Sequence, residues 1–357
     1  MNNKVLSKKV MISLLTISCV YLGGTSVLPI AEAAIVDGQD VSDGTTLNFT
    51  DNHTINQNMD KQPAITIDQN KNVTINAQGT LNILGSGKLS SQGNAIVYVY
   101  AGANLDFTGN NIIFSGSVAD GDKVDGILAN GANIGSTINF KNNYTKLTCT
   151  STDTDVRKDL SVMACIAGGV INFDHAVDIY GSATKSGVFG MYVNQAGSNI
   201  HAKDKVSIET VGGSTNRGIQ IANGGSAVFD SSLDVKASGD AAGGNYGVLI
   251  MSGGAIAVKD KLTVAVAGTA AKSGLHVQGG DSSAAISGAA DISLDTDSSG
   301  FAVTALDQGT IDFAGAVFIN KDNAKEDHLK NAAIATQGNS TVNINQSGNQ
   351  QVVIRSE

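Results

Sequence analysis

Residues 200–208, which read IHAKDKVSI, decide the fold. Two apolar pairs, Ile200/Ala202 and Val206/Ile208, each enclose one polar residue, and the second pair starts six residues after the first. Alternation with a period of two is typical of a β-strand that buries one face. The stretch therefore predicts two short strands joined by a tight corner.

The same double step recurs along the chain at a fixed spacing. In six consecutive copies the second pair follows the first by six residues, at Ile171/Val177, Ile200/Val206, Ala227/Leu233, Ile256/Leu262, Ala284/Ala290 and Ile311/Val317. A third apolar step precedes each double step, in segments that start at Gly190, Gly218, Gly247, Gly274 and Gly300, with degenerate copies at Gly126, Met163 and Asn331. Each repeat thus holds three short strands.

Constant strand spacing between unequal loops predicts a stack of similar turns rather than a set of hairpins. In such a stack each strand pairs in parallel with its counterpart one repeat away, and equivalent side chains form columns. We predict an all-β fold, a right-handed parallel β-helix (β-solenoid) with three strands per coil of about 26–31 residues. Residues 34–95 are expected to form an N-terminal cap and first irregular coils, and residues 96–357 the regular coils.

The composition argues against several classes of protein. Glycine is abundant, at 42 of 357 residues, but only 2 residues are proline, which does not fit a disordered linker protein. The formal net charge is −9, and the three arginines are Arg157, Arg217 and Arg355. Nucleic-acid binding requires a basic surface that displaces counterions, so we expect no nucleic-acid partner.

The first 33 residues have the pattern of a signal peptide. Lys4, Lys8 and Lys9 precede an apolar stretch, and Ala31 and Ala33 give the small-x-small pattern of a cleavage site before Ala34. An N-terminal membrane anchor is the alternative. No later segment reaches 18 consecutive apolar residues, so we expect no helical membrane span in the mature chain. The predicted location is exported, at the cell surface or outer membrane or extracellular.

Two cysteines remain after cleavage, in a compartment where disulfides can form. The repeat places Cys149 inward, at the position of Val264, and Cys165 outward, at the position of Tyr192 and His276. One interpretation is a core thiol and a surface thiol. The other is a disulfide across the segment 150–162, which requires suitable Cα separation.

No catalytic, cofactor-binding or metal-binding residue is predicted, and no cofactor. The histidines lack a metal-ligand partner at the spacing of known motifs, and the acidic pairs Asp153/Asp155 and Asp295/Asp297 do not start a calcium loop. The glycine pairs at 224–225, 243–244, 253–254 and 279–280 recur with the repeat, so they indicate corners rather than phosphate-binding loops. The histidines are His53, His175, His201, His276 and His328.

Asp178 and Asp234 carry the alternative of a carbohydrate-active β-helix enzyme, either a polysaccharide lyase or a hydrolase. The repeat places them on one outer face, two coils apart with Ser207 between them. Two strand spacings amount to roughly 9.6 Å, which falls in the range of inverting glycosidases. However, outward aspartates occur along the whole repeat, as expected of a solvated face.

The signal segment from Lys4 to Ala33 and the repeats from Gly126 to about Ile354 resemble the passenger region of bacterial autotransporters (type V secretion). The resemblance implies a non-enzymatic cell-surface β-helix used in adhesion, aggregation or display, with a host-surface protein or glycan as partner. A purely structural envelope component is a further alternative. We expect the segments 141–163 and 320–331 to act as contact loops.

One departure from the autotransporter pattern concerns the translocator barrel that normally ends these proteins. Here the sequence stops just after a predicted third strand at residues 352–354. An uncovered last coil exposes a sheet edge that favours pairing. We therefore expect a truncated or split passenger, or a partner over this edge such as a separate or downstream translocator barrel.

Overall fold

The computed structural model describes residues 34–36, 39–56, 63–86, 95–118, 124–152, 159–239, 243–268, 272–295, 300–320, 331–344, 348 and 350–355. The chain divides into two units, Met1–Glu32 and Ala33–Glu357, and all described residues belong to the second. The predicted signal peptide lies outside them. Within these ranges the secondary structure consists of strands, and no helix is long and apolar enough to cross a membrane.

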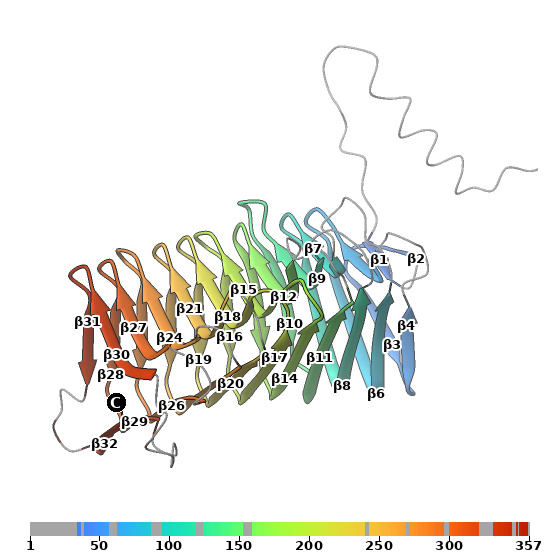
Figure 1. Ribbon diagram of the computed structural model, residues 1–357. Coiled ribbons are helices and arrows are strands. Elements are labelled where there is room, and N and C mark those ends of the chain that lie inside the picture. Colours follow the sequence, from blue (N-terminus) through green and yellow to red (C-terminus); the bar gives the residue numbers. More distant parts are fainter. Residues whose placement is uncertain are drawn as a thin grey trace, which may run out of the picture. The chain divides into compact units, whose positions relative to one another are not determined.

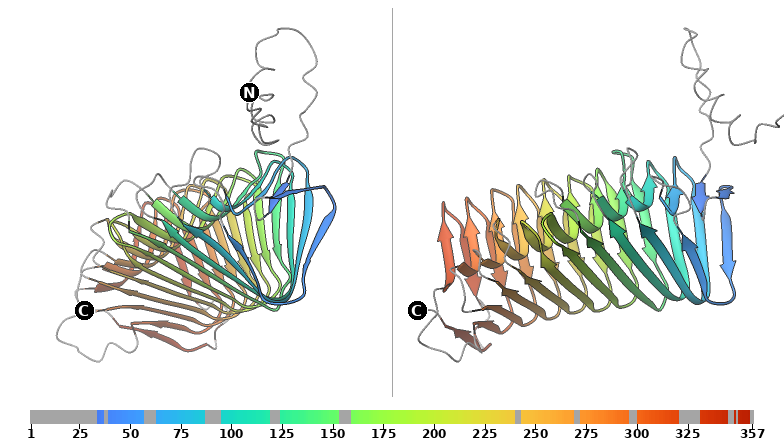
Figure 2. Two further views of the ribbon diagram at one scale, coloured as in Figure 1. Left: turned by 90° about the vertical axis from the view of Figure 1, so that its right-hand side faces the viewer. Right: turned by 45° about the vertical axis from the view of Figure 1, so that its right-hand side comes forward.

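Parallel strands stack turn upon turn into three faces (Figures 1 and 2). The first face contains β5 (Ile65–Ile67), β7 (Ala95–Tyr100), β9 (Val124–Asn130), β12 (Asp159–Ile166), β15 (Gly187–Asn194), β18 (Asn216–Ala222), β21 (Asn245–Met251), β24 (Lys272–Gln278), β27 (Gly300–Leu306) and β30 (Asn331–Gln337). At its N-terminal edge β1 (Ala34–Val36) pairs antiparallel with both β2 (Gln39–Val41) and β5.

The second and third faces follow in each turn. The second contains β3 (Thr45–Phe49), β10 (Ser136–Phe140), β13 (Gly169–Phe173), β16 (Asn199–Ala202), β19 (Ser226–Phe229), β22 (Ala255–Val258), β25 (Ser283–Ile286), β28 (Thr310–Phe313) and β31 (Thr341–Ile344). The third contains β4 (His53–Asn56), β11 (Tyr144–Ser151), β14 (Val177–Ala183), β17 (Val206–Gly212), β20 (Leu233–Ser238), β23 (Leu262–Ala267), β26 (Ala290–Leu294), β29 (Val317–Ile319) and β32 (Val352–Ile354). The long strands β6 (Asn72–Ser86) and β8 (Asn104–Val118) serve both faces.

Equivalent side chains form the predicted columns. Val206 pairs with Leu233, and Leu233 pairs with Leu262, all three at most 1% exposed. The six-residue spacing places both apolar pairs of each repeat inside the stack. The predicted fold class, an all-β, right-handed parallel β-helix with three strands per coil, is therefore confirmed.

Stacked aromatic rings fill part of the core at the end of the second-face strands. The ring centroids of Phe107 and Phe140 lie 5.0 Å apart, and those of Phe140 and Phe173 lie 4.8 Å apart. All three side chains are buried. Offset stacking of rings at this separation adds to the hydrophobic gain of burying them.

Buried amides hold the connections that lead from the third face to the first. The Asn216 side chain donates hydrogen bonds to the carbonyls of Thr210 and Ser238, and Asn245 donates to the carbonyl of Gly239. In the next turn Lys272 occupies the same column, and its ammonium pairs with Asp295. These side chains thus donate hydrogen bonds to backbone carbonyls at or near the ends of the third-face strands.

The prediction that Cys165 points outward is wrong. It pairs with Val193 rather than with Tyr192, and its side chain is fully buried. A register error of one residue transfers a side chain to the opposite face of a strand. The prediction for Met163 carried this error, because its counterpart is Met191 and not Gly190.

Two further positions shift by two residues, which leaves the side-chain face unchanged. Cys149 is buried as predicted, but it pairs with Gly181, and Leu147 occupies the column that leads to Val264. In the last repeats Val303 pairs with Leu275, so the counterpart of Gly274 is Ala302 and not Gly300.

The glycine pairs lie at corners, as predicted. Gly224 and Gly253 have φ of 81° and 80°, in the left-handed region that favours glycine, between a first-face and a second-face strand. The segment 141–163, in contrast, is mostly strand, because β11 and the start of β12 lie within it. Of the segment 320–331, residues 321–330 lie outside the described residues.

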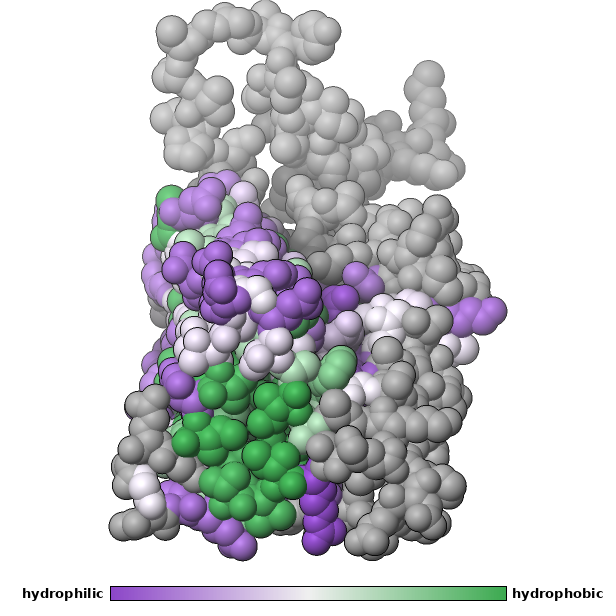
Figure 3. All heavy atoms as spheres, turned by 60° about the vertical axis from the view of Figure 1, so that its left-hand side comes forward, coloured by the Kyte–Doolittle hydropathy of each residue, from purple (hydrophilic) through white to green (hydrophobic). Residues whose placement is uncertain are grey.

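The last turn leaves an apolar patch at the C-terminal end of the stack (Figure 3). Val352 and Ile354 are 43% and 42% exposed, and Val342 and Ile344 are only partly buried. No other strand of the described ranges packs over these side chains. β32 pairs with β29, so the predicted third strand at residues 352–354 is confirmed.

Candidate functional site

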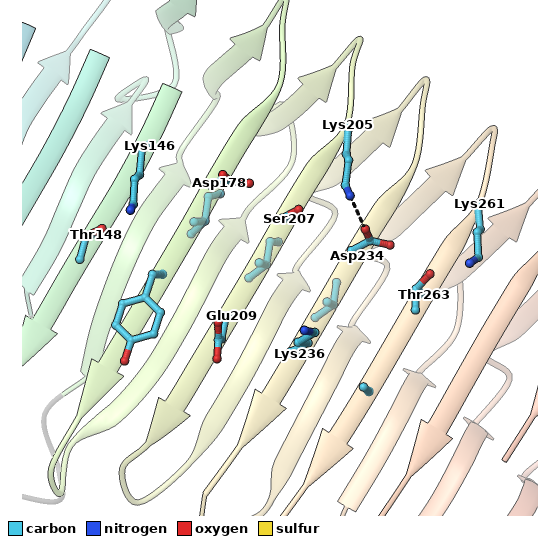
Figure 4. A pocket seen from close by; sticks show the side chains of 15 residues that line it. Lys146, Thr148, Asp178, Lys205, Ser207, Glu209, Asp234, Lys236, Lys261 and Thr263 are labelled. Carbon is cyan, nitrogen blue, oxygen red and sulfur yellow. Dashed lines mark ion pairs between the residues drawn. The ribbon is translucent and has the colours of Figure 1, made fainter. Parts of the chain in front are cut away.

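A shallow groove of about 780 Å³ lies on the outer side of the third face (Figure 4). Outward side chains of five neighbouring strands, β11, β14, β17, β20 and β23, line it. Outward and buried side chains alternate along a strand, so every second residue of each strand faces the groove. Because the strands pair in register, these residues form straight rows across the turns.

Two rows form the floor of the groove. Cross-strand pairing aligns the first row as Lys146, Asp178, Ser207, Asp234 and Thr263, and the second as Thr148, Tyr180, Glu209, Lys236 and Ala265. In the first row the small side chain of Ser207 lies between the larger Asp178 and Asp234. Lys205 and Lys261 extend the site at the corner that precedes the strands.

Asp178 has a neutral hydrogen-bond donor beside it. The Tyr144 hydroxyl donates to its Oδ2 over 2.6 Å. Burial, followed by this hydrogen bond and the charge of Asp178, raises the pKa of Tyr144 to about 12. Tyr144 therefore remains a neutral donor at physiological pH and holds the carboxylate in place.

Asp234 has a cationic partner. Lys205 Nζ lies 2.9 Å from its Oδ2. Burial acts to raise the pKa of Asp234, but the hydrogen bonds of Lys205 and Thr263 and the charges of Lys205 and Lys261 lower it overall. The same hydrogen bond raises the pKa of Lys205. Both groups are ionised at neutral pH.

The predicted alignment of Asp178 and Asp234, two turns apart with Ser207 between them, is confirmed. An inverting glycosidase needs one carboxylic acid with a raised pKa that protonates the leaving group. Asp234 has the opposite shift. The geometry thus brings together two carboxylates that already have partners.

The lysines and Tyr180 of the groove were missed by sequence reasoning. Their signal was present, since Lys146, Tyr180 and Lys236 occupy outward positions of the third strand in neighbouring repeats. The error of two residues in the repeat that contains Cys149 hid the alignment of Lys146 with Asp178.

Alternating charges border the groove at the corner between the second and third faces. The residues that directly follow five consecutive second-face strands are Lys141, Asp174, Lys203, Asp230 and Lys259. Lys203 lies 2.7 Å from Asp174, and Lys259 lies 2.7 Å from Asp230. We call these five residues the corner charge column.

The remaining candidate residues are dispersed. His201 bonds Asp230 over 2.8 Å, and His53 stacks on Phe49. His276 packs edge-on against Tyr246, and burial lowers its pKa. Within the described ranges no group of three potential metal-ligating side chains occurs. His175 is exposed, while His328, Asp153, Asp155 and Asp297 lie outside the described residues.

Cys149 and Cys165 are free buried thiols. Burial, with a contribution from the charge of Asp125, raises the pKa of Cys149 to about 12. Burial also raises the pKa of Cys165 well above its ordinary value. The disulfide alternative is therefore wrong for this structure, and so is the surface thiol.

The comparisons with known proteins identify no relative. The sequence matches no protein-family model, and no curated protein or solved structure is significantly similar to the chain.

Proposed function

We propose that the chain is an exported cell-surface β-helix, similar to an autotransporter passenger, that acts in adhesion or surface display without catalysis. The observation that carries the proposal is the uninterrupted parallel stack from β5 to β32, with polar side chains along the outer sides of its second and third faces. Rigid scaffolds of this kind present extended surfaces to partners.

The electrostatics of the groove favour binding over catalysis. Asp234 forms an ion pair with Lys205, and Asp178 accepts a hydrogen bond from Tyr144. The pKa of Asp234 is lowered, whereas acid catalysis of glycoside cleavage requires a carboxylic acid that is protonated near neutral pH. The carbohydrate-active enzyme stays as the competing hypothesis, because both carboxylates lie in the one groove.

Expression of the full chain in a bacterial host, followed by fractionation, tests the proposed export. We expect removal of residues 1–33 and recovery of the product at the cell surface or in the medium. Retention of the uncleaved chain in the cytoplasm would contradict the proposal.

Adhesion is tested with the purified product of residues 34–357. We expect binding to host-cell surfaces or glycans, and no cleavage of acidic polysaccharides. Cleavage that is lost in Asp178→Asn and Asp234→Asn variants would establish the enzyme instead. Surface location without binding to cells or glycans would favour a purely structural envelope component.

A further inference from the structure

The groove is locally cationic on an otherwise acidic solenoid. Its lining contains four lysines and three acidic residues. After removal of residues 1–33 the chain has 20 basic and 31 acidic residues, since three of 23 and one of 32 are lost. The charge of the groove therefore has the opposite sign to that of the chain as a whole.

Two of the four lysines form no direct ion pair, although the charge of Lys261 contributes to the lowered pKa of Asp234. Lys205 pairs with Asp234, and Lys236 lies opposite Glu209 on the neighbouring strand. Lys146 and Lys261 form no ion pair with any described residue. They lie on opposite sides of the groove, at β11 and just before β23, and Figure 4 shows both beside the floor residues.

The spacing of these cations fits an extended polymer. Strands of adjacent turns lie about 4.8 Å apart, so Lys146 and Lys261, four turns apart, are separated by roughly 19 Å along the stack. A linear saccharide that lies along the groove would cross one strand per sugar unit. Anionic groups on separate units would thus meet separate lysines.

The other side chains of the groove suit a sugar chain. Tyr180 is half-buried and presents an aromatic ring in the second row. Ser207, Thr263 and Thr148 provide hydroxyls that donate or accept hydrogen bonds. Asp178 and Glu209 add carboxylate oxygens, which are hydrogen-bond acceptors for hydroxyl groups. A ring, hydroxyls and a few charges in a shallow open groove are the components of saccharide recognition.

We infer that the groove binds an extended saccharide that carries carboxylate or sulfate groups, with Lys146 and Lys261 contacting anionic groups and Tyr180 packing on a sugar ring. The inference rests on the proposed function and specifies the ligand class of the adhesive surface. The affinity of the groove for such a saccharide falls with ionic strength, because exposed charge pairs are screened by salt.

Binding to the purified product of residues 34–357 tests the inference. The probes are a fluorescent heparin oligosaccharide, an oligogalacturonide and, as a neutral control, a cello-oligosaccharide, measured by fluorescence anisotropy at low and physiological ionic strength. We expect binding of at least one anionic probe and none of the neutral one. The double variant Lys146→Gln/Lys261→Gln should bind at least about fivefold more weakly, since each charged contact contributes up to about 1 kcal/mol.

The matched control is Lys71→Gln/Lys185→Gln, which removes the same charge from lysines outside the groove. We expect it to bind like the parent. Equal weakening by both double variants would overturn the inference, as would binding of the neutral probe or no binding of either anionic probe. Adhesion to cells without anionic saccharide binding would contradict only the ligand class, whereas cytoplasmic retention contradicts the proposed function.

Discussion

The corner between the second and third faces differs sharply from the connection between the third and first faces. The corner has a six-residue spacing in six turns and carries the corner charge column. The connections vary in length and rely on buried polar side chains such as Asn216, Asn245 and Lys272. Packing and spacing fix the corner, while individual hydrogen bonds fix each connection.

The largest expected effect is at the corner end of the second face. Phe140→Ala removes the middle ring of the stack formed with Phe107 and Phe173. We expect a loss of about 3–5 kcal/mol in the free energy of unfolding, because a large cavity remains. Urea denaturation measures it. The control Phe301→Ala removes a ring that is 43% exposed and should cost much less; equal losses would show that the stack adds nothing.

A smaller effect is expected at a connection. Lys272→Met removes a fully buried ammonium from its pair with Asp295, whose side chain is 31% exposed. Loss of one partner of such a pair should cost about 2–3 kcal/mol. Lys272→Asn, which restores the residue found at Asn245 in the preceding turn, should be less damaging. A more stable Lys272→Met variant would mean that this connection needs no polar link.

The tight first face gives the next effect. A Cβ at Gly218 would overlap Val235 Cγ1 and the Gly247 carbonyl oxygen. Gly218→Ala should therefore destabilise by about 1–2 kcal/mol through overpacking. The same column continues through Gly247 and Gly274 to Ala302, whose Cβ the structure accommodates. The variant Ala302→Gly is the control. Thermal unfolding compares the two, and a stabilised Gly218→Ala variant would refute the crowding.

The corner charge column gives a small, pH-dependent effect. Hydrogen bonds from Lys259 and then His201 lower the pKa of Asp230 below 3.8, so folding is stabilised above the unfolded-state pKa. This contribution disappears as the pH falls through the folded-state pKa. Asp230→Asn should cost about 0.5 kcal/mol at neutral pH, where exposed pairs contribute little, and almost nothing in strong acid.

Melting temperatures at neutral and acidic pH measure this difference. Asp260→Asn, another exposed aspartate near the same corner, is the control and should show less dependence on pH. A neutral-pH loss that persists unchanged in acid would rule out the charge as its cause.

The accessibility of Cys165 on β12 tests the register of the first face, and that of Cys149 on β11 tests the third face. Both are buried and both have raised pKa values, so neither should react with a thiol reagent in the native protein. Denaturation of the product of residues 34–357 without reductant should expose two reactive thiols. A reactive Cys165 in the native protein would contradict this structure and support the outward position predicted from the sequence.

The second and third faces were predictable because their strands alternate strictly between buried and exposed residues. In β16, for example, Ile200 and Ala202 are buried and His201 between them is partly exposed. First-face strands do not, because β15 begins with five consecutive buried residues and contains no exposed one. Without alternation the sequence offers no internal check of register, and the position of Cys165 was wrong for that reason.

The candidate site was predictable only in part, because it depends on register across turns. Asp178, Ser207 and Asp234 lie in repeats with the six-residue spacing, and their alignment followed from it. Lys146 lies in a repeat where Thr145 follows Ile138 by seven residues. This corner is one residue longer than the others and contains the buried Asn142. Because Asn142 is polar, the apolar pattern of the sequence gives no sign of the longer corner.

The direction of the backbone hydrogen bonds determines how this molecule responds to mechanical load. In the described part of the chain the backbone bonds between parallel strands of neighbouring turns, such as the bond from Val206 N–H to the Ser232 carbonyl, run along the direction of stacking. A pull on the two ends therefore acts directly along these bonds and detaches one turn at a time. A turn of 28 residues, such as Gly190 to Gly218, releases about 9 nm of chain. We therefore expect the solenoid to lengthen in steps under tension instead of unfolding all at once.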